Sequence, residues 1–282
     1  MDFDSLRRIV ASDSRARGAS VLCRPAFWGN ALQLFLEASR IIIVTGFYIK
    51  NAGAPETDGP PGAVILGRAL ARVGKDVVLL TDTKNYSALS ACSRSLDGPR
   101  AACFEDPEKI HLDMNLLVFI ERPGRASDGH YYNMKGVDIG DVVVPLDNIA
   151  EPAMRCGIPV LGIGDGGNEA GMGFFYDELT SLMPHYMSCL SRVSATLCVP
   201  VDISNWGAYA LAAVLSVFYR RWLGLDVGEE AWMLKILVEA GAIDGIRGAT
   251  GMSVDGVLLD GPDGLDATAL CLKNWYFGSF NV

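Results

Sequence analysis

The stretch Ile158–Gly173, IPVLGIGDGGNEAGMG, joins an apolar strand directly to a glycine-rich loop. Residues Ile158–Ile163 are almost all apolar, which is typical of a strand that is covered on both faces. The loop that follows carries Asp165, Asn168 and Glu169 among its glycines. Because ligands of open α/β sheets bind beyond the carboxyl ends of the strands, this loop predicts a binding site at the end of a parallel strand.

Similar apolar runs recur along the chain, with helical patterns between them. The predicted strands are Arg40–Thr45, Asp76–Thr81, Asn115–Ile120, Asp141–Val144 and Ile158–Ile163, with Ala195–Val199 as a sixth. The predicted helices are Phe27–Ala38, Gly62–Val73, Asp147–Cys156, Trp206–Trp222 and Gly228–Ala240. This alternation predicts an α/β fold, a doubly wound and mostly parallel sheet of about six strands with helices on both faces.

A single domain is expected, because 282 residues, half of them hydrophobic, suit one large α/β core. Within it, residues 1–39 are predicted to form an N-terminal helical segment. Residues 249–282 are predicted to form a C-terminal appendage, with a hairpin in Ser253–Asp260 and a helix in Leu265–Asn274.

Composition excludes several classes of partner. The net charge of −9 excludes nucleic acid, since phosphate contacts need a basic surface. The longest apolar run, Ala208–Phe218, is too short to span a bilayer. The seven cysteines include no CxxC pair, and the N-terminus has no apolar signal core, so a reduced, cytoplasmic protein is predicted. A small-molecule partner fits, and a homo-oligomer is compatible with the sequence.

The segment Thr45–Gly62 is longer than an ordinary strand-to-helix connection of about 2–6 residues. One interpretation is a ligand cradle that uses Thr57, Gly59 and Gly62. The other is a helix cap, in which Thr57 or Asp58 satisfies the free N–H groups of the next helix. The two interpretations stand at even odds.

The segment Glu121–Met134, ERPGRASDGHYYNM, gathers many functional side chains after another predicted strand. Arg122 and Arg125 could hold carboxylates, because a guanidinium matches their geometry. His130 could act as general acid or base near neutral pH. The alternative is a solvated surface turn with a structural ion pair.

The glycines of the opening stretch match GxGxxG over Gly162–Gly167, which suggests a dinucleotide. The pattern is weak, because Asp165 would oppose a pyrophosphate and no strand ending in an acid follows at the required distance. A metal or polar-ligand site that uses Asp165, Asn168 and Glu169 fits better. The alternative is a tight turn in which Asn168 caps the next helix.

A fourth segment, Val201–Tyr209, places Asp202 at the end of the possible sixth strand. Capping of the following helix by Ser204 or Asn205 is the default interpretation, and Asp202 could instead face the cleft.

These segments together resemble the D-glutamate cyclase family, in its C-terminal catalytic-type domain. The matching stretches are ETDGPPGA at Glu56–Ala63, ERPGRASDGHYYNMKG at Glu121–Gly136, GIGDGGNEAGMG at Gly162–Gly173 and DISNWGAYAL at Asp202–Leu211. The resemblance implies a hydro-lyase that converts D-glutamate to 5-oxo-D-proline with loss of water, aided by a divalent metal, usually manganese. Because the vertebrate member is mitochondrial, the mitochondrial matrix is the alternative location.

The corresponding hypothesis is an intramolecular attack of the α-amine on the side-chain carboxylate, which a metal ion would polarise. We expect Asp165 and Glu169 to bind Mn²⁺ or Mg²⁺, with Asp58 or Asp128 completing the ligand set.

The other expected roles concern the substrate itself. His130 is the candidate acid–base residue, and Arg122 or Arg125 would hold the α-carboxylate. The expected substrate-binding residues are Thr57, Gly59, Gly62, Gly166, Gly167 and Asn168. A non-catalytic sensor domain for an amino acid or nucleotide is the second hypothesis, and a nicotinamide-dependent oxidoreductase is a distant third.

Overall fold

The computed structural model describes residues 1–14, 16–106 and 113–280. Its centre is a six-stranded sheet in the order β5-β4-β1-β6-β7-β8, and every neighbouring pair is parallel. The strands are β1 Arg40–Thr45, β4 Asp76–Thr81, β5 Ala101–Cys103, β6 Leu116–Ile120, β7 Val160–Gly164 and β8 Leu197–Pro200. The predicted α/β class with a parallel sheet of about six strands is confirmed.

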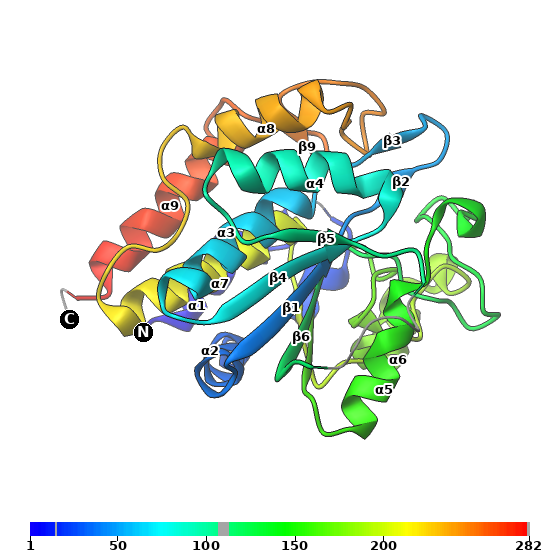
Figure 1. Ribbon diagram of the computed structural model, residues 1–282, viewed down its shortest axis with the longest axis horizontal. Helices are drawn as coiled ribbons and strands as arrows, with labels where there is room; N and C mark the ends of the chain where they lie inside the picture. The colour runs from blue at the N-terminus through cyan, green and yellow to red at the C-terminus, as the bar shows by residue number, and fades with distance from the viewer. Residues whose placement is uncertain (15, 107–112, 281–282) are drawn as a thin grey trace.

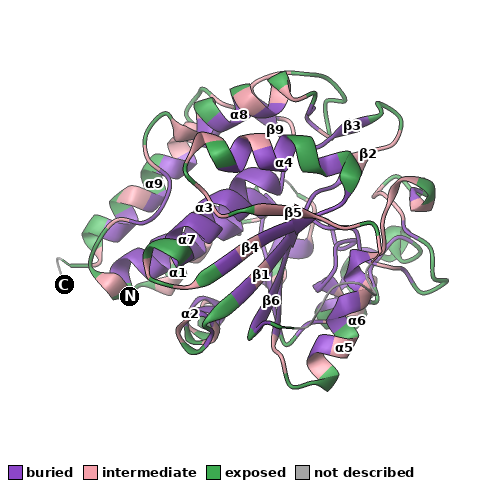
Figure 2. Ribbon diagram, in the orientation of Figure 1, coloured by how far each residue is buried: buried purple, intermediate pink, exposed green. Residues whose placement is uncertain are grey.

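Helices cover both faces of this sheet (Figure 1). The helices of the described residues, including those that pack on other helices, are α1 Phe3–Val10, α2 Ala26–Glu37, α3 Pro60–Arg72, α4 Thr83–Ser95, α5 Ala150–Arg155, α6 Tyr176–Leu182, α7 Ser204–Tyr219, α8 Glu229–Glu239 and α9 Leu265–Gly278. Side chains of a strand alternate between faces, so Ile41 and Ile43 of β1 pack in the cluster with α2, α3 and α7. Val44 packs instead in the cluster of α5 on the other face. The central strands are buried over most of their length (Figure 2).

The order of the strands reverses between β1 and β6. The chain runs outward from β1 to β4 and β5 on one side, and from β6 to β7 and β8 on the other. At such a switch point the connections leave the sheet on opposite faces, which opens a crevice at the carboxyl ends of the central strands. The segments after β1, β6 and β7 therefore meet at one edge of the sheet.

The predicted strand Asp141–Val144 is wrong. A 3₁₀ turn over Gly140–Val142 stands there, outside the sheet. Val142 and Val143 pack beside a small separate cluster formed by Phe47, Tyr131 and Ile139, whereas Val144 packs on the cluster of α5. The valines are thus half-buried without a strand partner, which a local pattern cannot distinguish from a strand.

Two elements that the sequence did not indicate complete the fold. Strand β5 has only three residues, all half-buried, and α4 is rich in polar residues. Helix α4 begins at Asp82, whose side chain accepts a hydrogen bond from the Asn85 N–H (3.1 Å). Strand β5 is too short, and helix α4 is too polar, to give the apolar pattern by which a strand or an amphipathic helix is recognised.

The C-terminal segment forms the predicted hairpin and helix. Strands β9 Ser253–Val254 and β10 Val257–Leu258 pair antiparallel, and α9 packs on α1 and α7. The Trp275 indole N–H of α9 donates to the Asp2 carbonyl (2.8 Å). A second short hairpin, β2 Tyr48–Ile49 with β3 Ala54–Pro55, lies in the segment after β1.

Over the described ranges, every helix is too short or too polar to traverse a lipid bilayer.

Candidate metal centre and its cavity

Three carboxylates converge where β1, β6 and β7 end. Asp58 lies in the segment after β1, and Glu121 and Asp165 directly follow β6 and β7. Their oxygen atoms lie within 4.8 Å of one another, and each residue is at least nine-tenths buried. We call Asp58, Glu121 and Asp165 the acidic triad.

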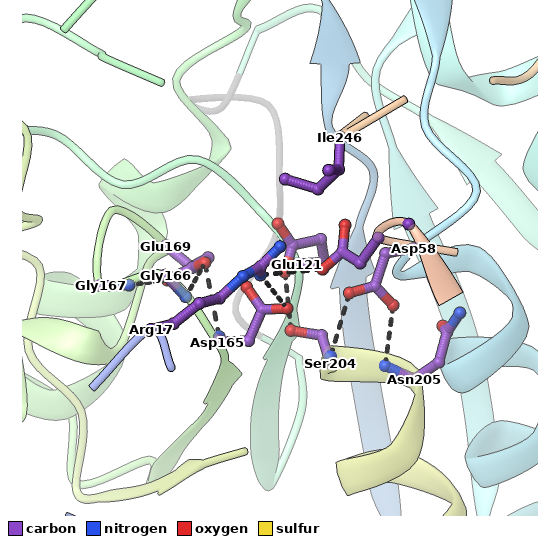
Figure 3. A network of polar contacts seen from close by, with 12 residues as sticks. Arg17, Asp58, Glu121, Asp165, Gly166, Gly167, Glu169, Ser204, Asn205 and Ile246 are labelled. Carbon is purple, nitrogen blue, oxygen red and sulfur yellow. Dashed lines mark hydrogen bonds and ion pairs between the residues drawn. The ribbon is translucent and has the colours of Figure 1, made fainter. Parts of the chain in front are cut away.

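Two helix N-termini meet beside the triad and cap each other, and Figure 3 shows the half of this exchange in which Asp58 binds Ser204 and Asn205. Asp58 accepts hydrogen bonds from the backbone N–H groups of Ser204 (3.0 Å) and Asn205 (2.9 Å), in the first turn of α7. The Asn205 side-chain oxygen accepts from the N–H groups of Gly59 (3.0 Å) and Gly62 (2.8 Å), at the start of α3. The positive ends of both helices therefore lie beside the carboxylates and stabilise negative charge there.

Glu121 is oriented by the same helix start. The Ser204 hydroxyl donates a hydrogen bond to its Oε2 (2.6 Å). Glu121 itself has a φ of 45°, a left-handed conformation that is costly for a residue other than glycine. This strained backbone turns the chain at the end of β6, where the side chain joins the triad.

The C-terminal hairpin contributes a fourth carboxylate, Asp255. Asp255 and Gly256 form its two-residue turn, and both have positive φ values (52° and 80°), as a type I′ turn requires. Asp244 accepts a hydrogen bond from the Gly256 N–H (2.8 Å) and holds the turn in place. Asp255 is 4% exposed and lies 2.8 Å from Arg17, a cation that also pairs with Asp165 (2.7 Å).

Glu169 uses both of its carboxylate oxygens inside its own loop. Oε1 accepts from the Gly166 N–H (2.8 Å) and Oε2 accepts from the Gly167 N–H (2.7 Å). Gly167 has a φ of 103°, which an L side chain rarely adopts, so the loop depends on a glycine there. Glu169 thus shapes the loop that presents Asp165.

Burial first, and then the neighbouring carboxylates, raise the pKa of each triad member and of Glu56 well above its ordinary value. Arg17 partly opposes this shift at Asp165. Several buried acids that repel one another are unfavourable unless positive charge joins them. The triad supplies only hard oxygen donors, which are the ligands that Mn²⁺ and Mg²⁺ prefer, so a divalent cation fits this donor set.

The triad opens onto a cavity of about 680 Å³. Its acidic lining comprises Glu56, Glu121, Asp165, Glu169 and Asp255. Apolar side chains and several cations also line it, among them Arg17, Phe47, Lys50, Met134, Lys135, Ile139 and Arg247. The cavity therefore joins a candidate cation site to groups that could hold an anionic ligand.

Some predicted site residues are brought together in this cavity. Asp165, Glu169, Gly166 and Asn168 all line it, and Asp58 lies beside two lining residues, Glu121 and Asp165, in the triad. Asn168 donates from its side-chain amide to the Tyr132 carbonyl (2.9 Å) rather than capping a helix.

The predicted cradle of the first segment is engaged within the protein. The Thr57 hydroxyl donates to the Ser253 carbonyl (2.9 Å), and the Thr57 N–H donates to the Ile243 carbonyl (2.9 Å). The backbone N–H groups of Gly59 and Gly62 donate to the side-chain oxygen of Asn205. These bonds favour the helix-cap interpretation, with Asn205 as the capping residue.

His130 and Asp128 lie apart from this cavity lining. His130 is 60% exposed, and its Nδ1 lies 2.9 Å from an Asp138 oxygen. Asp128 is also exposed and accepts a hydrogen bond from the Tyr132 hydroxyl (2.6 Å). Their expected acid–base and metal-binding roles therefore stay predictions, which no contact with the cavity lining supports.

The two arginines expected to hold a carboxylate contact protein groups instead. Arg122 is 1% exposed, pairs with Asp82 (2.5 Å) and donates to two backbone carbonyls, of Gly46 and Val144. Arg125 donates to the Asn148 side chain (2.6 Å). Neither is part of the cavity lining.

Sequence reasoning assigned no role to Glu121, Glu56, Arg17 or Asp255. Glu121 had a usable signal, because it is the first polar residue after a buried strand, as Asp165 is after β7. Arg17 and Asp255 come from opposite ends of the chain, and only tertiary packing brings them together.

Comparison with known proteins agrees with these motifs. Residues 6–264 match the family described as D-glutamate cyclase-like, C-terminal. The human protein "D-glutamate cyclase, mitochondrial" is 31% identical over 301 residues, which cover 89% of this chain and 48% of that protein. The chain thus spans about half the length of this relative.

Among solved structures, an exopolyphosphatase-related protein from Bacteroides fragilis aligns with a TM-score of 0.37 at 11% identity. The alignment covers 80% of this chain and 61% of that one. The family match extends over most of the chain, through all three strand ends that bear the triad. The chain therefore belongs to the D-glutamate cyclase-like, C-terminal family.

Proposed function

We propose that this chain is a metal-assisted cyclase that converts D-glutamate to 5-oxo-D-proline with loss of water. The observation that carries the proposal is the acidic triad, three buried carboxylates within 4.8 Å of one another beside a cavity of about 680 Å³. Family membership and the activity named for the human relative support the choice of reaction.

Asp58, Glu121 and Asp165 would hold the cation, Mn²⁺ or Mg²⁺. A divalent ion there would supply Lewis acidity toward the side-chain carboxylate of the substrate, which is otherwise a poor electrophile. Glu121 takes the place that the sequence had given to Glu169, because a carboxylate oxygen of Glu121 lies within 4.8 Å of oxygens of Asp58 and Asp165.

The residues of the cavity would hold glutamate in a folded conformation. Phe47, Met134 and Ile139 supply apolar walls that exclude water, which competes with ring closure. Holding the amine near the carboxylate is itself effective, since well-oriented intramolecular reactions reach effective molarities of about 10⁵–10⁸ M. The proposal thus needs a shaped cavity more than a nucleophile from the protein.

Glu56 is our candidate for moving protons in place of His130. It lines the cavity, is 7% exposed and packs against Gly245, and no side-chain hydrogen bond joins it to another described residue. A carboxylate in this position can accept protons from the ammonium group, which loses two on forming the lactam, and pass them to the departing oxygen, which leaves as water.

The test is to incubate the protein with D- or L-glutamate, after metal removal and after Mn²⁺ addition, and to resolve 5-oxoproline by chiral chromatography. We expect 5-oxo-D-proline from D-glutamate only when Mn²⁺ is present. Asp128→Asn is a matched control and should keep this activity, since Asp128 lies outside the cavity lining. Absence of 5-oxoproline under every condition would overturn the proposal.

The alternatives gain less support. A sensor domain would use the same cavity, and ligand-induced stabilisation without product would identify it in the same incubation. An oxidoreductase needs loop N–H groups that are open to a pyrophosphate, but those of Gly166 and Gly167 are bound by Glu169.

A further inference from the structure

Arg17 reaches the acidic triad from the N-terminal segment. Its Nη1 atom lies 2.7 Å from Oδ2 of Asp165 (Figure 3) and 2.8 Å from Oδ2 of Asp255. Burial disfavours its charge, but Asp165, Asp255 and Glu121 outweigh that effect and raise the pKa of Arg17. Arg17 therefore stays positively charged beside the candidate cation site.

The loop that carries Arg17 is strained and firmly tied down. Asp13, Ala16 and Gly18 all have positive φ values (58°, 52° and 86°), although only one of them is glycine. Asp202, after β8, accepts the backbone N–H groups of residues 12, 13 and 14 at 3.1, 2.9 and 3.3 Å. Strain of this kind persists only where other contacts hold it, and it is typical of functional sites.

Both ion pairs of the Arg17 guanidinium are closest at Nη1. Within the described residues, no hydrogen bond joins Nε or Nη2 of Arg17 to another side chain, and we take the edge formed by these two atoms as the one offered to a ligand. The side chain is 24% exposed and lines the cavity. This edge has the two parallel donors that bind a carboxylate in bidentate fashion.

The other arginines near the crevice cannot take this role as readily. Arg122 is buried against Asp82, and Arg125 is bonded to Asn148 outside the cavity lining. Lys135 and Arg247 do line the cavity, but both are exposed. Among the arginines that the structure describes, Arg17 is the one that directly contacts a triad carboxylate and also lines the cavity.

We propose that Arg17 is a substrate-binding residue that holds one carboxylate of a five-carbon dicarboxylic ligand while the other carboxylate lies at the triad. The contact through Asp165 sets the spacing between the two sites. This inference rests on the proposed function for the choice of ligand class, and it assigns the specificity of that cavity to the N-terminal loop.

The experiment titrates glutarate into the Mn²⁺-loaded protein by isothermal titration calorimetry. Glutarate has both carboxylates but no amine, so it cannot cyclise and its binding is measured apart from turnover. We expect Arg17→Gln to weaken glutarate binding by about 10- to 100-fold, the loss of a charge-assisted pair. Arg17→Lys keeps the positive charge but lacks the two parallel donors, so its glutarate affinity should lie between those of the unaltered protein and Arg17→Gln.

Two controls separate ligand binding from structural damage. Mn²⁺ affinity without glutarate should not weaken in Arg17→Gln, because the change removes a positive charge beside the triad. Arg247→Gln, a change of the same type at an exposed cavity residue, should shift glutarate affinity by less than about threefold.

The inference is overturned if Arg17→Gln leaves glutarate affinity unchanged, or weakens Mn²⁺ and glutarate binding together. It is also overturned if Arg247→Gln causes the larger loss, or if the unaltered protein does not bind glutarate. If Arg17→Gln does not fold, Arg17→Lys decides alone by the same criteria. Arg17-dependent glutarate binding without 5-oxoproline formation would support this inference and contradict the proposed function, and the reverse pattern would do the opposite.

Discussion

At the scale of single residues, two acidic side chains in one loop do different work. Asp165 joins the triad, whereas Glu169 accepts hydrogen bonds from the loop that presents Asp165. Sequence reasoning grouped both as metal ligands, because a glycine-rich loop with two acids does not reveal which carboxylate its own N–H groups will bind. The distinction becomes visible only when the loop conformation is known.

This difference predicts opposite outcomes for two similar substitutions. Asp165→Asn should abolish Mn²⁺-dependent turnover while leaving the unfolding free energy nearly unchanged or higher, since it removes one of several repelling buried charges. Glu169→Gln should lower the unfolding free energy by about 1–3 kcal/mol, because an amide N–H₂ replaces an acceptor that faces a backbone N–H. Urea denaturation beside the turnover assay distinguishes them, and equal stability losses in both variants would contradict this assignment.

A second prediction at this scale concerns Glu230 of α8, which is buried and accepts a hydrogen bond from the Tyr209 hydroxyl (2.6 Å). Burial raises its pKa from 4.5 to about 7. Protonated Glu230 therefore contributes stability that is complete below a pH of 4.5 and is lost as the pH rises through about 7.

The full effect corresponds to about 3 kcal/mol. Glu230→Gln should remove this loss, so the variant gains stability over the unaltered protein between pH 5 and pH 8, as measured by urea denaturation across that range. Glu239→Gln, at an exposed site on the same helix, is the control and should keep the original pH profile. Parallel profiles for Glu230→Gln and the unaltered protein would refute the prediction.

At the scale of elements, the sequence predicted well those strands that are long, apolar and covered on both faces. Strands β1 and β4 have the predicted bounds, and β6, β7 and β8 differ by one or two residues at their ends. The predicted strand Asp141–Val144 was wrong because three valines can pack half-buried outside a sheet. The short β5 and the polar α4 gave no periodic signal at all.

The caps of α3 and α7 were predicted in part, because the capping residues were recognised but assigned to the wrong helix. Sequence reasoning expected each helix to be capped by residues of its own chain segment, but the caps are exchanged, with Asp58 on α7 and Asn205 on α3. Asn205→Ala should therefore cost about 1–2 kcal/mol of unfolding free energy, as other cap losses do, and should also weaken Mn²⁺ binding by displacing the Asp58 segment.

Asn30→Ala, at an exposed position of α2, is the matched control and should change the unfolding free energy by less than about 0.5 kcal/mol. Thermal or urea unfolding of both variants measures the difference. An Asn205→Ala protein as stable as the control would show that the exchanged cap contributes nothing.

At the scale of the whole molecule, residues from both terminal parts of the chain line the cavity. The loop that bears Arg17 and the hairpin that bears Asp255 meet over the carboxyl ends of the central strands. The doubly wound topology, which the sequence predicted, fixes where the crevice opens. What covers that crevice could not be predicted, because no local pattern links residues from opposite ends of the chain.

Cation binding should act on the stability of the entire fold. Mn²⁺ relieves the repulsion among buried carboxylates and binds the folded state in preference, so it should raise the melting temperature by several degrees at a concentration about 100 times its Kd. Differential scanning fluorimetry with EDTA or Mn²⁺ measures the shift. Asp128→Asn should retain this response, and a protein whose melting temperature ignores Mn²⁺ would argue against a cation at the triad.

The claim that the acidic triad binds a divalent cation is tested most directly by replacing Glu121, which the structure places in the triad. Mn²⁺ binding by the metal-stripped protein and by Glu121→Gln can be followed by electron paramagnetic resonance, together with 5-oxo-D-proline formation from D-glutamate. We expect the unaltered protein to bind one Mn²⁺ per chain. In Glu121→Gln, the Mn²⁺ affinity and the rate of 5-oxo-D-proline formation should both fall by at least about 100-fold. Turnover by Glu121→Gln at the rate of the unaltered protein, with unchanged Mn²⁺ affinity, would contradict it.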